Sequence, residues 1–266
     1  MKFIDTHAHL NFEAFKKDYS DVIEKSFQNE IEAIINIGSR FDNSKEALNI
    51  AEKFKGVYAA IGFHPDHLTE IENIQEEVKK FETLADNPKV AAIGEIGLDN
   101  YYFRTGINPD TKENRNKAQE IFKSFLSFAC SVDLPVIIHS READKETAAI
   151  LTEYSKKLSK KGVVHCFTGS LKFAQKVIEL GFYIGFTGII TYSKTDDLQK
   201  VVKKIPLDKI LIETDAPFLA PQAYRGQRNE PIYVKEIAKE IASIKNISFE
   251  EVANITTKNA KKLFNI

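Results

Sequence analysis

The 266-residue sequence has few cysteines and no long apolar segment. Its two cysteines, Cys130 and Cys166, are far apart, which excludes a disulfide-rich secreted domain and a four-cysteine zinc module and suits a reducing compartment. No apolar run approaches the roughly 18 residues that cross a bilayer. Residues 1–5 carry charge too early for a signal peptide. We therefore expect a cytoplasmic protein that has no membrane partner.

The sequence also lacks an excess of positive charge. Its 37 Lys and Arg residues balance 38 Asp and Glu residues, giving a net charge of −1. This balance excludes nucleic-acid binding through bulk positive charge, so an anionic substrate would need a local attraction. At 43% hydrophobic and 28% charged, the chain has a globular composition. No linker interrupts it, so we expect one domain over residues 1–266.

Short, β-branched apolar runs recur along the chain, with amphipathic segments between them. The predicted strands are residues 2–5, 33–37, 57–61, 90–94, 136–138, 163–164, 182–185 and 210–212. Unbroken runs of this kind are typical of parallel strands buried on both faces. The intervening helices include residues 112–132, 236–241 and 249–264. Eight such units over about 250 residues predict a single-domain (β/α)8 TIM barrel, with an open doubly wound sheet as the alternative.

Five of the six histidines follow predicted strands. His7 and His9 follow the first strand, His64 the third, His139 the fifth and His165 the sixth, while Glu95 and Asp215 follow the fourth and eighth. A single histidine in such a place is more often structural. All strands of a barrel open onto one face at their carboxyl ends, however, so these side chains are expected to converge there as a metal site.

The number of ligands predicts two ions. Four histidines and two carboxylates exceed one catalytic tetrahedral site, but two divalent ions that share Glu95 as a bridge use all six. Such a pair activates a water molecule and stabilises charge that develops on the substrate, with Asp215 as the general base. Histidine ligands favour Zn²⁺ or Mn²⁺, whereas nucleases often use Mg²⁺, so the identity of the metal stays open.

The arginines indicate an anionic substrate. Five of the six follow predicted strands, namely Arg40, Arg104, Arg141, Arg225 and Arg228. A guanidinium group binds phosphate through two parallel hydrogen bonds, although these arginines could instead pair with nearby acids.

The predicted irregular segment 99–110 contains Tyr101, Tyr102 and Phe103, which either stack on bases or pack against the barrel rim. Cys166 neighbours His165, and strand alternation predicts that its thiol points away from the site.

Seven motifs resemble the TatD family of metal-dependent deoxyribonucleases. They are DTHAHL (5–10), GFHP (62–65), GEIGLD (94–99), PVIIHSR (135–141), HCFTG (165–169), ETDAP (213–217) and RGQRNEP (225–231). They follow one another in the family's order. Two positions depart from the family pattern: Asp66 follows the His-Pro pair, and Phe125 stands where a second glutamine often lies.

The resemblance implies a TIM barrel with a centre of one or two divalent ions, whose ligands are His7, His9, Glu95, His139, His165 and Asp215. It also implies that His64, Arg141, Arg225 and Asn229 bind substrate. The implied activity is hydrolysis of DNA, as a 3′–5′ exonuclease on single strands. A D-aminoacyl-tRNA deacylase is the alternative, a non-catalytic metal-binding protein is a third possibility, and a monomer is expected.

Overall fold

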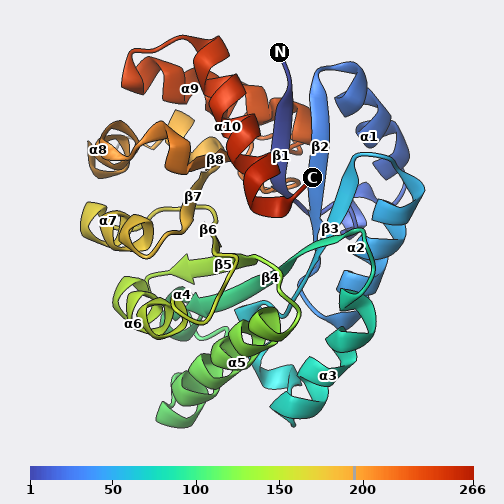
Figure 1. The fold of residues 1–266 in the computed structure, drawn as a ribbon, viewed down its shortest axis with the longest axis vertical. Helices are drawn as coiled ribbons and strands as arrows, with labels where there is room; N and C mark the ends of the chain where they lie inside the picture. The colour runs from blue at the N-terminus through green and yellow to red at the C-terminus, as the bar shows by residue number, and fades with distance from the viewer. Residues whose placement is uncertain (194–195) are drawn as a thin grey trace.

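Eight parallel strands form one sheet in the computed structural model, which describes residues 1–193 and 196–266. The strands are β1 (Phe3–Ala8), β2 (Ile31–Ile37), β3 (Val57–Ile61), β4 (Val90–Asp99), β5 (Val136–Arg141), β6 (Gly162–Val164), β7 (Tyr183–Phe186) and β8 (Ile210–Ile212). Their spatial order follows the chain from β1 to β8. A doubly wound sheet reverses its order at a switch point. The sequential order therefore confirms the predicted TIM barrel (Figure 1).

Contacts near the carboxyl ends of β1 and β8 bring the two edges of the sheet together. Ala8 and Ala216 form a parallel bridge. The His9 amide donates to the Ala216 carbonyl at 2.7 Å, and the Asp215 amide donates to the His7 carbonyl at 2.8 Å. The barrel is thus closed beside three of the predicted metal ligands.

Helices surround the barrel on its outer face (Figure 1). They are α1 (Tyr19–Gln28), α2 (Phe41–Lys53), α3 (Ile74–Ala85), α4 (Asn100–Arg104), α5 (Lys112–Ser131), α6 (Asp144–Tyr154), α7 (Leu171–Glu179), α8 (Asp196–Lys204), α9 (Val234–Lys245) and α10 (Phe249–Phe264). Short 3-10 turns are η1 (Glu13–Phe15), η2 (Pro65–Glu70), η3 (Gly188–Thr191), η4 (Leu207–Lys209), η5 (Gln222–Tyr224) and η6 (Pro231–Tyr233). Within residues 1–193 and 196–266, no helix combines the length and apolarity that a bilayer span requires.

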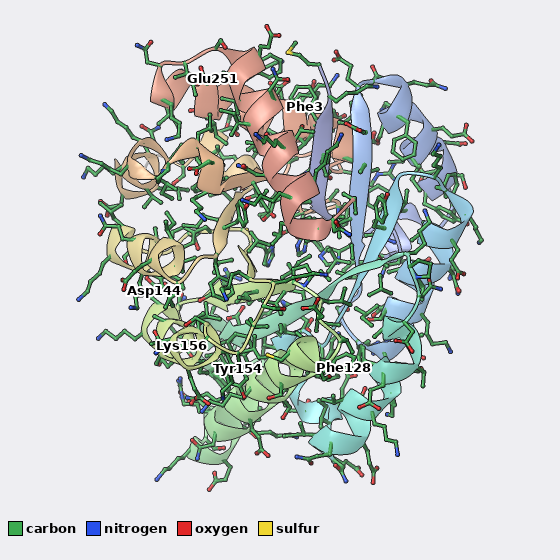
Figure 2. The ribbon with its side chains drawn as sticks, viewed as in Figure 1. Phe3, Phe128, Asp144, Tyr154, Lys156 and Glu251 are labelled. Atoms are coloured by element: carbon green, nitrogen blue, oxygen red, sulfur yellow. The ribbon has the colours of Figure 1, made fainter. Side chains whose placement is uncertain are left out.

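The core has two layers because neighbouring residues of a strand face opposite sides of the sheet. Phe3 packs under the outer helices, whereas Ile4 belongs to the cluster inside the barrel. Leu263 and Phe264 of α10 join that inner cluster and cover the amino-terminal end of the barrel. Charged side chains such as that of Glu251 stand on the outer surface (Figure 2). The opposite, carboxyl-terminal end is left for polar side chains.

Strand β4 is longer than the predicted residues 90–94 and runs to Asp99. The following segment is also more regular than predicted, since residues 100–104 form α4. Asp99 caps this helix by accepting a hydrogen bond from the Tyr102 amide at 3.0 Å. An aspartate at this position is a sequence signal for a helix start, and the prediction of an irregular segment over residues 99–110 did not use it.

Candidate metal centre

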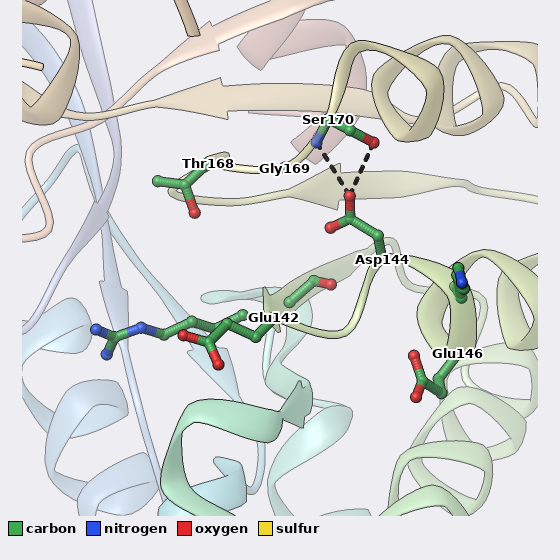
Figure 3. Close-up of a pocket in the computed structure, with 9 residues that line it drawn as sticks. Glu142, Asp144, Glu146, Thr168, Gly169 and Ser170 are labelled. Atoms are coloured by element: carbon green, nitrogen blue, oxygen red, sulfur yellow. Dashed lines mark hydrogen bonds between the residues drawn. The ribbon is translucent and has the colours of Figure 1, made fainter. Parts of the chain in front are cut away.

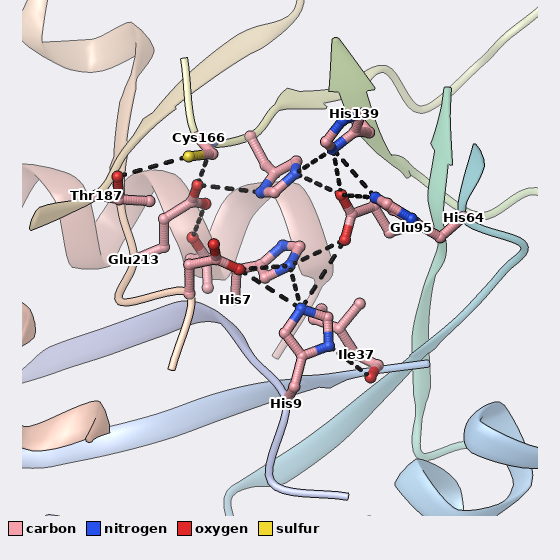
Figure 4. Close-up of polar contacts among 12 residues, drawn as sticks. His7, His9, Ile37, His64, Glu95, His139, Cys166, Thr187 and Glu213 are labelled. Carbon is pink, nitrogen blue, oxygen red and sulfur yellow. Dashed lines mark hydrogen bonds and ion pairs between the residues drawn. The ribbon is translucent and has the colours of Figure 1, made fainter. Parts of the chain in front are cut away.

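The six predicted ligands meet at the carboxyl-terminal mouth of the barrel. His7 lies in β1 with His9 just after it, Glu95 in β4, His139 in β5, His165 after β6 and Asp215 after β8. Five of them line a cavity of about 570 Å³, and the fully buried His7 lies beside it. Figure 4 shows the imidazole rings gathered around the carboxylate of Glu95.

The Glu95 carboxylate lies between two groups of histidines. Its Oε1 is 2.6 Å from His165 Nε2 and 2.7 Å from His139 Nδ1. Its Oε2 is 3.2 Å from His7 Nε2 and 4.0 Å from His9 Nε2. His64 Nε2 also lies 3.4 Å from Oε1. Each oxygen therefore faces a different group of imidazoles, as a carboxylate bridging two ions would.

The separations between donor atoms fit a divalent ion. Bonds of 2.0–2.1 Å in a tetrahedral site place neighbouring ligand atoms about 3.3 Å apart. His7 Nε2 and His9 Nε2 are 3.2 Å apart, and Asp215 Oδ1 lies 3.5 Å from both. His64, Glu95 and His139 form a further group whose donor atoms lie within 4.8 Å of one another. The residues present can hold metal on both sides of Glu95.

Electrostatics favour an ionised carboxylate at the centre. Burial opposes ionisation of Glu95, but the nearby His165 and His64 hold its pKa well below the ordinary value. Burial likewise opposes the charged form of His165, yet Glu95 and Glu213 raise its pKa well above the ordinary value. Burial and then repulsion from His165 lower the pKa of His7. Divalent ions bind ionised carboxylates and neutral imidazoles, so binding here would release histidine protons.

Three further buried carboxylates lie behind the predicted ligands, namely Asp5, Asp99 and Glu213. The sequence motifs did not single them out as functional. Asp99 Oδ2 is 3.0 Å from His139 Nε2, and Glu213 Oε1 is 3.5 Å from His165 Nδ1. Carboxylates in such positions orient metal-binding histidines. Asp5 and Glu213 each precede a predicted ligand by two residues. For Asp5, which lies in β1 with His7, alternation along the strand was the available signal.

His64 and Arg141 both line the cavity. His64 Nδ1 is 2.6 Å from Asp66 Oδ1, and its Nε2 is 3.4 Å from Glu95 Oε1. Burial opposes protonation of His64, but Glu95 and Asp66 raise its pKa to about 10. The Arg141 guanidinium lies 3.7 Å from the centre of the Tyr101 ring. Arg141 therefore brings a fixed positive charge to the predicted metal centre, and His64 is a second group that can carry one.

The other predicted substrate contacts lie elsewhere. Arg225 stacks on Tyr192, 4.1 Å from the ring centre, and is not part of the cavity lining. Asn229 is fully buried, and its Nδ2 donates to the carbonyls of Thr214 at 2.7 Å and Phe218 at 2.6 Å. The Asn229 amide thus holds the turn after β8 and is not part of the cavity lining.

The predicted ring of arginines is largely an arrangement of ion pairs. Arg104 pairs with Glu142 at 2.7 Å, and Arg228 pairs with Asp18 at 2.7 Å. Arg40 lies 3.5 Å from Glu70. These three arginines pair with acids, which was the alternative to substrate binding. Arg141 is the arginine that lines the cavity.

The aromatic residues after β4 divide between packing and the cavity. Phe103 is buried, and Tyr101 lies under the Arg104 and Arg141 guanidinium groups. Tyr102 lines the cavity. Of the three aromatics, Tyr102 is therefore the one placed to meet a substrate.

Cys166 contradicts the prediction that its thiol points away from the site. It lines the cavity, with Sγ 3.6 Å from Thr187 Oγ1. The alternation argument fails because β6 ends at Val164 and Cys166 adopts a left-handed backbone with φ of 44°. Burial raises the pKa of the thiol well above the ordinary value, which argues against a thiolate nucleophile.

Comparison with known proteins agrees with this geometry. The family model described as TatD related DNase matches residues 4–265. An uncharacterized metal-dependent hydrolase of Bacillus subtilis, YabD, is 40% identical over 98% of both chains. YcfH of Escherichia coli, described in the same words, is 34% identical over 100% of this chain and 97% of its own.

A solved structure is similar over almost the whole fold. The crystal structure of YjjV, a TatD homolog from Escherichia coli, superposes with a TM-score of 0.89 at 31% identity. The match covers 99% of this chain and 98% of that one. On the family model, the relatives and the shared fold together, the chain belongs to the TatD family of metal-dependent hydrolases.

Proposed function

We propose that the protein is a deoxyribonuclease that hydrolyses phosphodiesters in single-stranded DNA from the 3′ end, with two divalent ions per subunit. The observation that carries the proposal is the position of Glu95, whose two oxygens face separate groups of imidazoles. Two-ion sites of this kind are typical of nucleases and phosphatases. His7, His9 and Asp215 would hold one ion and His139 and His165 the other, with Glu95 between them.

Bound ions supply an acidified water molecule and a Lewis acid for the developing negative charge. The protein supplies the general base, for which Asp215 is best placed at the end of β8. Burial opposes its ionisation, but the hydrogen bond from His9 and the charge of His7 lower its pKa. Asp215 therefore stays ionised and able to accept a proton near neutral pH.

The charges at the mouth favour a phosphate over a neutral carbonyl substrate. Arg141 carries a fixed positive charge, and Glu95 and Asp66 raise the pKa of His64 in the metal-free protein. Both side chains border the cavity, whereas the whole chain has a net charge of −1. They provide the local attraction that the overall composition lacks, and a guanidinium group can bind phosphate through two hydrogen bonds.

The test begins with metal-depleted protein. Mg²⁺, Mn²⁺ or Zn²⁺ is added back separately, and single-stranded DNA labelled at either end is followed on a gel. We expect metal-dependent, stepwise shortening from the 3′ end that is lost in a His139→Ala variant. The matched control is His67→Ala, since His67 is the one histidine that follows no strand and pairs with Glu70 at 2.7 Å. This control is expected to retain activity.

Absence of cleavage with every metal would contradict the nuclease proposal. Metal-hydroxide chemistry does not distinguish phosphorus from carbonyl carbon, so the same preparations are then assayed with D-aminoacyl-tRNA. Release of the amino acid, lost in His139→Ala, would establish the deacylase alternative on the same ligands.

A further inference from the structure

One side of the cavity is apolar and carries an exposed aromatic ring. Phe12 follows β1, Ile189 lies in η3, and Phe218 and Leu219 follow β8, and all four line the cavity. Phe218 is 51% exposed. Among the residues that the structure describes, the other exposed large apolar side chains are those of Met1 and Ile107. Phe218 is thus the exposed one that lies at the predicted metal centre.

Phe218 and Phe12 form a continuous aromatic surface, which we call the aromatic shelf. The Phe12 ring stacks on the His9 imidazole with centres 4.4 Å apart and planes 27° apart. Phe218 stands edge-on to Phe12 at 6.1 Å and to His9 at 6.4 Å. His9 is a predicted ligand, so a ring on the shelf would lie next to a phosphate held at the metal centre.

The backbone of Phe218 is fixed, so its exposure does not come from a loose loop. Its amide donates to the Asp215 carbonyl at 2.9 Å, and its carbonyl accepts from Asn229 Nδ2 at 2.6 Å. Asn229 is itself fully buried. An exposed aromatic ring on a fixed backbone beside a polar site is the kind of group that lines ligand pockets.

A second cavity adjoins the metal cavity at Arg141. It has a volume of about 590 Å³ and shares Ser140, Arg141 and Thr168 with the metal cavity (Figure 3). Its lining adds three carboxylates, from Glu142, Asp144 and Glu146, against one lysine. Asp144 accepts hydrogen bonds from the Ser170 amide at 3.0 Å and from Ser170 Oγ at 2.9 Å. Glu142 pairs with Arg104 at 2.7 Å, and Arg141 also lines this cavity, so positive side chains largely balance its carboxylates.

We infer that Phe12 and Phe218 form a stacking site for the nucleobase next to the scissile phosphate. The inference rests on the proposed function, since it names how that site holds a nucleotide. Every base has a flat π face, and stacking on an aromatic side chain tolerates any sequence. The shelf would therefore supply affinity for DNA without base specificity. This affinity would not depend on an excess of positive charge, which the chain does not have.

The test compares two single-stranded DNA oligonucleotides, one with a normal 3′-terminal base and one abasic at that position. For the wild type with the working metal, we expect kcat/KM for the normal strand to exceed that for the abasic strand by about 5- to 160-fold, the range of one stacked base. Phe218→Ala should bring this ratio close to one by slowing only the normal strand. Phe218→Leu, which keeps apolar area but no π face, should lose most of the preference.

The matched control is Ile107→Ala, which removes an equally exposed apolar side chain that does not line the metal cavity. It should leave the ratio unchanged. An unchanged ratio in Phe218→Ala, or an equal loss on both strands, would overturn the shelf. An equal loss on both strands would mean that Phe218 acts only by positioning the turn after β8.

A binding measurement separates this inference from the proposed function. Dissociation constants for phosphorothioate-linked versions of the two strands are measured by fluorescence anisotropy. If the wild type cleaves neither strand, the nuclease proposal fails. The shelf is then supported by tighter binding of the base-bearing strand that Phe218→Ala abolishes, and overturned by equal binding of both strands.

Discussion

At the scale of single residues, Asp5 joins the two edges of the barrel below the metal ligands. Its Oδ1 accepts from the Thr214 amide at 2.9 Å and the His7 amide at 3.3 Å. Its Oδ2 accepts from Thr214 Oγ1 at 2.5 Å. Asp5 thereby holds β1 against the residues that follow β8. The pairing between these two segments is a single bridge from Ala8 to Ala216, whereas the other neighbouring strands pair at more than one residue. The position of His7 depends on this carboxyl group.

Asp5 also makes stability depend on pH. Burial, with a smaller contribution from the charge of Glu213, raises its pKa from 3.8 to about 8. The folded protein keeps a proton that the unfolded chain releases, so the free energy of unfolding falls as pH rises through this range. In metal-free protein, we expect the stability of the wild type relative to Asp5→Asn to decrease from about pH 5 to about pH 8, measured by urea unfolding.

The control for this experiment is Asp18→Asn. The hydrogen bond from Arg228 lowers the pKa of Asp18. The ionised Asp18 therefore stabilises the folded protein at neutral pH, and this contribution is lost only when the pH falls below the ordinary pKa of an aspartate. Its difference from the wild type should be flat over the same interval. A flat difference for Asp5→Asn as well would show that Asp5 is ionised in the folded protein.

At the scale of secondary structure, glycines allow β4 and β5 to approach closely at the metal centre. Gly97 pairs with His139 in the parallel register, and it has a φ of 154°. A Cβ atom on Gly97 would overlap the His139 carbonyl oxygen. The close approach places Glu95 and His139 within 2.7 Å of each other.

We expect Gly97→Ala to cost about 2–4 kcal/mol of stability, since it combines overpacking with a strained backbone. It should also weaken metal binding, because β5 must move and carry His139 with it. The matched control is Gly106→Ala, where φ is 77° but no atom lies within 4 Å of a Cβ. Denaturant unfolding and metal titration of both variants check this, and equal losses would refute the role of close packing.

At the scale of the whole molecule, the charge balance predicts weak salt dependence of DNA binding. Each phosphate neutralised on a single strand contributes a slope of about −0.7 to log K against log salt. Among the residues that the structure describes, Arg141 is the one lysine or arginine that lines the cavity, and the net charge is −1. We therefore expect a slope of about −0.7 to −2 for oligonucleotide binding at fixed metal concentration.

Arg141→Ala should make that slope shallower by about one phosphate, or roughly 0.7. Lys160→Ala, which removes a lysine that pairs with Asp133 away from the mouth, should leave the slope unchanged. A slope several times steeper in the wild type would instead indicate an extended basic path for the strand.

The architecture and the location of the site were determined by the sequence itself. Apolar runs identified eight strands, and the parallel arrangement brings all their carboxyl ends to one face. Histidines and carboxylates that follow strands must then meet, whatever the details of packing. The convergence of His7, Glu95 and Asp215 could be predicted for this reason, and so could the family.

Only the tertiary structure decided which side chains face the cavity once a strand has ended. Cys166 turns into the site through a left-handed backbone, Asn229 is buried under a turn, and Phe218 is left exposed beside His9. Strand alternation no longer applies at these positions. The pairing of Arg104 and Arg228 with acids likewise depends on residues far away in the chain. Local sequence patterns carry no information about such distances, so these features follow from barrel closure and loop packing alone.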